Sequence, residues 1–82
     1  MIKAEVKIGD WCYVFGDDIF VQISDIEYDF NNNVKHVYAI DDINGIFVDR
    51  SLTWICSKDE DPEKIFQELS YEELEERMIN WK

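Results

Sequence analysis

Few residues in this sequence could carry out acid–base, nucleophilic or metal chemistry. His36 is the only histidine, and Cys12 and Cys56 are the only cysteines. General base catalysis by His36 would need a nucleophile or an orienting carboxylate beside it, and no Ser or Cys motif accompanies it. A zinc site needs about four ligands, and these residues supply three at unpatterned spacing. We therefore expect no enzyme activity, no metal and no cofactor, and a structural or surface role for His36.

Two further features, the segment 41–45 and the two cysteines, do not indicate a functional site. The segment 41–45, Asp-Asp-Ile-Asn-Gly, resembles the start of a calcium loop, but such a loop needs a bidentate Glu at its twelfth position, which is Leu52 here. An Asn-Gly turn accounts for the segment better. Cys12 and Cys56 lie far apart in the chain, and residues 1–5 show no apolar secretory segment. We expect two reduced, buried thiols and a cytoplasmic location, with no membrane span.

The charge is strongly acidic and uneven. The net charge is −11, and residues 59–82 hold nine acids and three bases against ten acids and five bases in residues 1–58. Such a field repels nucleic acid and anionic membrane and attracts basic surfaces. The expected partner is a protein with a basic surface, with no direct nucleic-acid contact. The candidate binding residues are the acids Asp59, Glu60, Asp61, Glu63, Glu72, Glu73, Glu75 and Glu76.

These acids have two interpretations. They can form a solvated helix face that confers solubility. Alternatively, helical carboxylates spaced one turn apart can imitate a row of phosphates and dock in the basic cleft of a nucleic-acid-handling protein.

The aromatic residues support an alternative function. In SH3-like and Tudor-like folds, exposed aromatic side chains bind polyproline or methylated Lys and Arg through stacking and cation–π contact. For any single aromatic, burial in the core remains the competing interpretation. The candidates for such a groove are Trp11, Tyr13, Phe20, Tyr28, Tyr38 and Trp54.

Alternating apolar residues indicate five short strands that would hold these candidates. Turn residues separate runs at 11–15, 19–28, 34–43, 46–49 and 52–56. In the second run the alternation changes phase at Asp25, which predicts a bulge or a sharp bend. Asn44-Gly45 predicts a two-residue type I′ hairpin that places Ile43 opposite Ile46 and Ala39 opposite Arg50. Five such strands are expected to close into a small antiparallel barrel or roll.

The composition after Ser57 indicates helix. Asp61 is a good N-cap with Pro62 at the first helical position, which predicts a helix near 62–69. The segment 70–73, Ser-Tyr-Glu-Glu, is a capping box, flanked by Leu69 and Leu74 as a hydrophobic staple. The second helix is expected near 71–81 and places one apolar face against the barrel. The residues of that face are Tyr71, Leu74, Met78 and Trp81.

The segment 7–14, Lys-Ile-Gly-Asp-Trp-Cys-Tyr-Val, resembles the opening of small SH3-like barrel proteins of phage and mobile elements. Those proteins end in a short capped helix, which Leu69–Leu74 matches, whereas the acidic segment 58–68 departs from their pattern. The resemblance implies a five-stranded SH3-like barrel over residues 1–57 and an acidic helical extension over 58–82, packed together as one domain. It carries no catalytic residue, and it favours an inhibitor that mimics nucleic acid.

Overall fold

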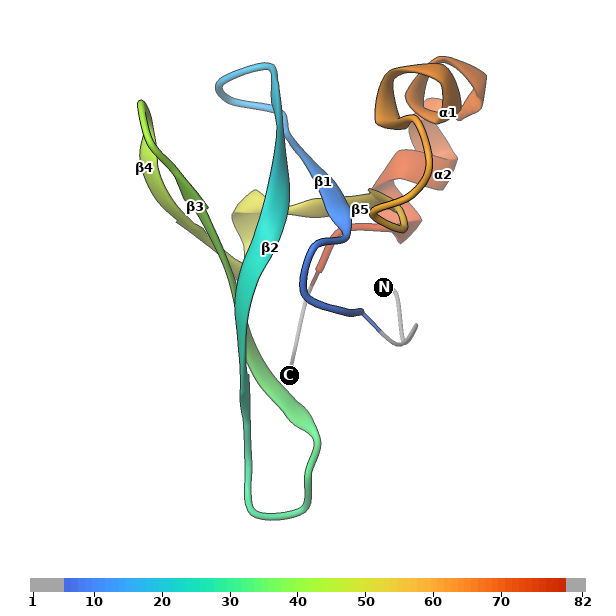
Figure 1. The fold of residues 1–82 in the computed structure, drawn as a ribbon. Coiled ribbons are helices and arrows are strands. Elements are labelled where there is room, and N and C mark those ends of the chain that lie inside the picture. The colour runs from blue at the N-terminus through green and yellow to red at the C-terminus, as the bar shows by residue number, and fades with distance from the viewer. Residues whose placement is uncertain (1–5, 80–82) are drawn as a thin grey trace.

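The computed structural model describes residues 6–79 as one antiparallel sheet with two short helices after it (Figure 1). The sheet order is β4-β3-β2-β1-β5, and a single 3₁₀ turn, η1, joins β4 to β5. The mainly β fold with C-terminal helices is therefore confirmed. The elements are β1 Trp11–Val14, β2 Ile19–Tyr28, β3 Val34–Asp41, β4 Gly45–Val48, η1 Asp49–Ser51, β5 Thr53–Cys56, α1 Pro62–Glu68 and α2 Tyr71–Glu76.

The long strand β2 joins two ladders, and it bends where the sequence changes phase. Residues 19–22 pair with β1, whereas pairing with β3 begins at Ile23. The register shifts between Ile23 and Asp25, which confirms the predicted bulge. Because of this shift, Ile23 and Ile26 are both buried although they have opposite parity in the chain.

The sheet stays open, so the expectation of a closed barrel is wrong for the described residues. β4 and β5 are the two edge strands and do not pair with each other. The C-terminal segment covers the outer edge of β5 instead: the Trp54 N–H donates to the Arg77 carbonyl at 3.0 Å, and the Ile79 N–H donates to the Leu52 carbonyl at 3.0 Å. The edge of β5 that barrel closure would need is therefore already occupied.

The β3–β4 hairpin also differs from its prediction. Asp41 pairs with Gly45, so the loop holds the three residues 42–44, and Ile40 rather than Ile43 lies opposite Ile46. The Asp41 carboxylate accepts hydrogen bonds from the Asn44 N–H at 2.8 Å and the Ile43 N–H at 3.2 Å. Gly45 has a φ of +94°, but Asn44 does not have the positive φ that a type I′ turn requires. The prediction of a two-residue turn did not take the Asp41 side chain into account, and these hydrogen bonds stabilise the longer loop.

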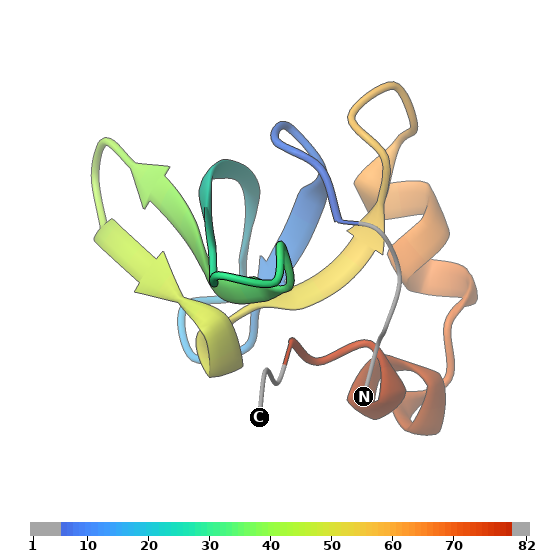
Figure 2. The ribbon, with the colours of Figure 1, turned by 90° about the horizontal axis from the view of Figure 1, so that it is seen from below.

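Apolar side chains form one cluster on each face of the sheet, as strand alternation requires. Cys12, Val14 and Val21 belong to the first cluster, with the fully buried Ile79. Tyr13 belongs to the second cluster, against which α1 packs (Figure 2). In Figures 1 and 2 the helices lie at the β5 end of the sheet and the β3–β4 hairpin at the opposite end.

The two helix starts are confirmed, but the second helix is shorter than predicted. The Asp61 side chain accepts from the Glu63 N–H, and Ser70 and Glu73 form the reciprocal capping box. α2 ends at Glu76, after which residues 77–79 run along β5. On the predicted apolar face only Leu74 is a buried helical residue, because Tyr71 is 69% exposed and Met78 lies beyond the helix. Trp81 falls outside the described residues.

Candidate functional site

His36 is held by a side-chain contact with Asp49. Its Nδ1 lies 2.7 Å from a carboxylate oxygen of Asp49, and the other oxygen of Asp49 accepts the Val37 N–H at 2.8 Å. Asp49 has a φ of +41°, and its carbonyl accepts the Leu52 N–H at the start of β5. These contacts tie β3 to the η1 turn. No local pattern indicates the His36–Asp49 pair, because thirteen residues separate the two side chains in the chain.

The two cysteines are buried and poorly suited to nucleophilic chemistry. Desolvation, with the nearby Asp10 and Cys56, raises the pKa of Cys12 to about 12. Desolvation, with Glu60 and Asp10, also raises the pKa of Cys56. A thiol must be deprotonated to attack, so both remain thiols near neutral pH. No group of three or more potential ligands that could hold a metal occurs among residues 6–79.

Asp10 is a buried carboxylate that no sequence pattern marked as a functional candidate. It is 4% exposed, and one of its oxygens accepts the Lys7 N–H at 2.9 Å and the Trp54 indole N–H at 3.0 Å. A buried charge is tolerated where such donors satisfy it. Asp10 therefore links the segment before β1 to β5 and has a structural role.

The six candidate aromatics do not form one groove. Tyr13 is buried, its ring lies 4.3 Å from that of Phe66 of α1, and its hydroxyl donates to Asp18. Trp11 and Phe20 pack against the same cluster under the helices. Trp54 packs against the opposite cluster, with the Arg77 guanidinium 5.3 Å from its ring centroid.

Tyr28 and Tyr38 lie apart from these four, on the strands away from the helices. Tyr28 is 54% exposed. The Tyr38 hydroxyl donates to Glu27 at 3.3 Å, and desolvation together with Glu27 raises the Tyr38 pKa. Of the six, Trp11 and Phe20 line the cavity that opens beside β2.

The eight candidate acids are all exposed, on α1, α2 and the segment before them. We call them together the acidic helix surface. Three also make local bonds: Glu60 accepts the Ser57 N–H, Asp61 caps α1 and Glu73 completes the capping box of α2. Within residues 6–79 the one ion pair is His36–Asp49, so these carboxylates have no salt-bridge partner there. Arg77 points inward, where its guanidinium donates to the Ile55 carbonyl at 2.8 Å.

The helices hold this acidic surface against the sheet. Ile65, Phe66 and Leu69 are partly buried against the second cluster, which contains the buried Leu74. The Phe20 and Phe66 rings meet edge to face at 5.5 Å. A carboxylate surface on docked helices keeps its spacing, whereas one on a free tail would not.

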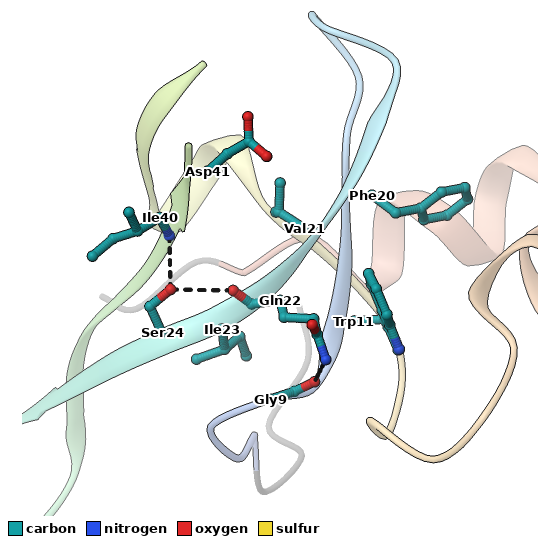
Figure 3. Close-up of a pocket in the computed structure, with 9 residues that line it drawn as sticks. All are labelled: Gly9, Trp11, Phe20, Val21, Gln22, Ile23, Ser24, Ile40 and Asp41. Atoms are coloured by element: carbon teal, nitrogen blue, oxygen red, sulfur yellow. Dashed lines mark hydrogen bonds between the residues drawn. The ribbon is translucent and has the colours of Figure 1, made fainter. Parts of the chain in front are cut away.

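A cavity of about 440 Å³ lies where β2 and β3 diverge, and we call it the β2–β3 cavity (Figure 3). Trp11 and Phe20 stand on the helix side, Ile40 and Asp41 on the hairpin side, and Ser24 between them. The aromatic residues that the sequence suggests for a groove include Trp11 and Phe20 of this lining, but neither Ile40 nor Asp41 was predicted to join them. The phase change at Asp25 was the available signal, because it marks where the strands separate. The cavity is lined by Gly9, Trp11, Phe20, Val21, Gln22, Ile23, Ser24, Ile40 and Asp41.

Comparison with known proteins yields no match to a family model, a curated protein or a solved structure. Across residues 6–79, neither helix is long and apolar enough to cross a membrane.

Proposed function

We propose that this chain is a non-catalytic binding domain that docks the basic surface of a partner protein through its acidic helix surface. The observation that carries the proposal is the set of eight exposed carboxylates on α1, α2 and the segment before them, with both helices packed on the sheet. Fixed charges attract a basic surface without the entropic cost of ordering a flexible tail. They also raise the association rate, because complementary fields steer the encounter.

The class of partner follows from the arrangement of the charges. Glu72 and Glu76 lie one helical turn apart on α2, and Glu75 lies beside them. Such a row presents negative charge at intervals, as a nucleic-acid backbone does. We therefore propose a nucleic-acid-handling protein as the partner, with this domain occupying its nucleic-acid site as an inhibitor or modulator.

An open SH3-like roll is the fold we propose within the observed sheet. Two ladders, β2-β1-β5 and β2-β3-β4, share the bent strand β2, and a 3₁₀ turn joins β4 to β5. This arrangement supports the resemblance of residues 7–14 to small SH3-like proteins of phage and mobile elements, a source in which inhibitors of host nucleic-acid enzymes are common.

The test is affinity capture from the source cells with three forms of the full chain. The first is the wild type, and the second carries Lys at Glu72, Glu75 and Glu76. Glu73 stays unchanged because its side chain accepts the Ser70 N–H in the capping box. The third is a matched control with Lys at the exposed positions 17, 27 and 42, which changes the net charge equally at sites outside the helices.

The proposal expects a basic protein that the wild type and the control retain and the helix variant loses. Retention should fall steeply between low and high salt, because exposed charges interact strongly only within about 8–10 Å at physiological salt. Added duplex DNA should displace the captured protein. Equal retention by the helix variant and the wild type would refute the role of the acidic helix surface, and retention unaffected by DNA would refute nucleic-acid mimicry.

A further inference from the structure

The β2–β3 cavity exposes strand backbone inside the sheet. The Ile23 N–H donates to the Asp10 carbonyl and the Ile23 carbonyl accepts the Gly9 N–H, so Ile23 turns its backbone groups toward β1. Hydrogen-bonding direction alternates along an antiparallel strand, so Phe20 and Gln22 turn their N–H groups toward β3. Pairing with β3 begins only at Ile23, and Ile40 and Asp41 pair with β4. The N–H groups of Phe20 and Gln22 therefore form an open edge of β2 ahead of the first β2–β3 pair.

Side chains keep the two strands apart at this point. The Ser24 hydroxyl bridges the strands, because it accepts the Ile40 N–H at 2.8 Å and donates to the Gln22 carbonyl at 3.5 Å (Figure 3). The Gln22 amide turns away and donates to the Gly9 carbonyl at 3.0 Å. The volume of about 440 Å³ lies within the range of roughly 300–1,000 Å³ that is typical of ligand sites.

The lining chemistry selects a positively charged, extended ligand. Trp11, Phe20 and Ile40 give apolar walls, and no Lys, Arg or His lines the cavity. Asp41 supplies a carboxylate on the hairpin side, across the cavity from Trp11 (Figure 3). Its Oδ2 accepts three hydrogen bonds from the hairpin loop, whereas its Oδ1 accepts none from the residues the structure describes. Hydrogen bonds from Asn44 also lower the Asp41 pKa, so the carboxylate is ionised at neutral pH.

We propose that the β2–β3 cavity binds an extended, Lys- or Arg-bearing segment of a partner protein. The segment adds a short strand to the open edge at Phe20 and Gln22, as in β-augmentation. Its basic side chain lays the alkyl stem along the apolar wall and brings the charged head to Asp41. This site is separate from the acidic helix surface and does not depend on the function proposed for that surface. A second copy of this chain fits less well, because each copy carries a net charge of −11.

The experiment titrates full-length ¹⁵N-labelled protein with a capped pentapeptide, acetyl-Thr-Val-Arg-Val-Thr-amide, at physiological salt. Two matched peptides accompany it: one with Glu in place of Arg, and one with N-methylated valines, which cannot donate backbone hydrogen bonds from those residues. We expect the Arg peptide to shift the Phe20 and Gln22 amides and the Trp11 indole, and to slow hydrogen exchange at those two amides. The other two peptides should bind at least several-fold more weakly.

Two protein variants test the carboxylate. Asp41→Asn removes the charge but keeps an oxygen that can accept the hairpin N–H groups, and it should weaken Arg-peptide binding about 3- to 5-fold, as for a solvent-accessible ion pair. Asp42→Asn removes the same charge one residue away, outside the cavity lining, and should leave the affinity unchanged. The triple Lys variant of α2 should still bind the peptide, which separates this site from the acidic helix surface.

Five results would overturn the proposal. Absence of shifts at millimolar peptide would rule out the site, and equal binding of the N-methylated peptide would rule out strand addition. Equal affinity for the Glu peptide, or equal effects of the two Asn variants, would rule out the role of Asp41. Shifts at Phe20 and Gln22 that follow protein concentration without peptide, with a dimer in sedimentation, would assign the open edge to a second copy instead.

Discussion

Replacing the buried carboxylate of Asp10 should destabilise the domain more than any other single change at its turn. The carboxylate accepts the Lys7 N–H, three residues before Asp10, and the Trp54 indole N–H, 44 residues after it in the chain. The backbone of Asp10 also accepts the Ile23 N–H at 2.9 Å. Asp10→Ala keeps that backbone bond and removes only the acceptor shared by the two donors.

The size of the effect follows from those two bonds. Both are only partly buried, so each should contribute about 1–1.5 kcal/mol, the upper part of the range for an ordinary hydrogen bond. The free energy of unfolding should therefore fall by about 2–3 kcal/mol. A chain of 82 residues has a total stability of roughly 4–12 kcal/mol, so this loss is a large fraction. The midpoint of thermal unfolding should drop by roughly 10–20 °C.

Urea unfolding, followed by circular dichroism, measures the change. Asp10→Asn is the matched control, because its amide oxygen can still accept a hydrogen bond, and it should lose only about 1 kcal/mol. The Trp54 indole proton should shift in the NMR spectrum of the Ala variant and much less in the Asn variant. A loss below about 0.5 kcal/mol for Asp10→Ala, the range of an ordinary surface substitution, would refute the linking role.

Three further outcomes follow from the described structure. Gly45→Ala should cost about 1 kcal/mol in chemical unfolding, because Gly45 has a φ of +94° and open space around it, whereas Gly16→Ala, also in open space but without a positive φ, should be nearly neutral; equal effects would contradict the turn geometry. Leu74→Ala should cost about 2–4 kcal/mol in the same assay, because Leu74 is 6% exposed in the cluster that docks the helices, and a neutral result would mean that α2 is not packed there. Cys12, whose pKa is raised to about 12, should resist a thiol reagent until the chain unfolds. Because this folded pKa exceeds the unfolded value of 9.0, the free energy of unfolding should decline as pH rises from about 9 toward 12. Rapid labelling of the native protein at pH 8 would contradict the burial of Cys12.

Local sequence determined most of the secondary structure. The helix caps at Asp61 and Ser70 follow from side chains that bond backbone groups two or three residues away, so their residue types were sufficient. The bulge near Asp25 follows from the change of apolar parity along one strand. These features depend on residues that are close together in the chain, so the sequence alone was sufficient to predict them.

The β3–β4 hairpin could not be predicted correctly from its two turn residues alone. Asn44-Gly45 favours a two-residue turn on its own, but the Asp41 carboxylate holds a three-residue loop by accepting N–H groups within it. The Asp41 side chain, three residues before Asn44, thereby determines the register of β3 against β4.

Only the tertiary structure decided how the sheet ends and where a ligand can enter. Residues 77–79 turn away from α2 and cover β5, because β5 offers unpaired backbone groups and the first cluster has room for Ile79. The β2–β3 cavity exists because β2 is held by β1 along residues 19–22 while β3 follows β4. The sequence alone shows the acidic charge. The docking of the helices that carry this charge, and the position of the open edge of β2 beside Asp41, depend on contacts between residues far apart in the chain.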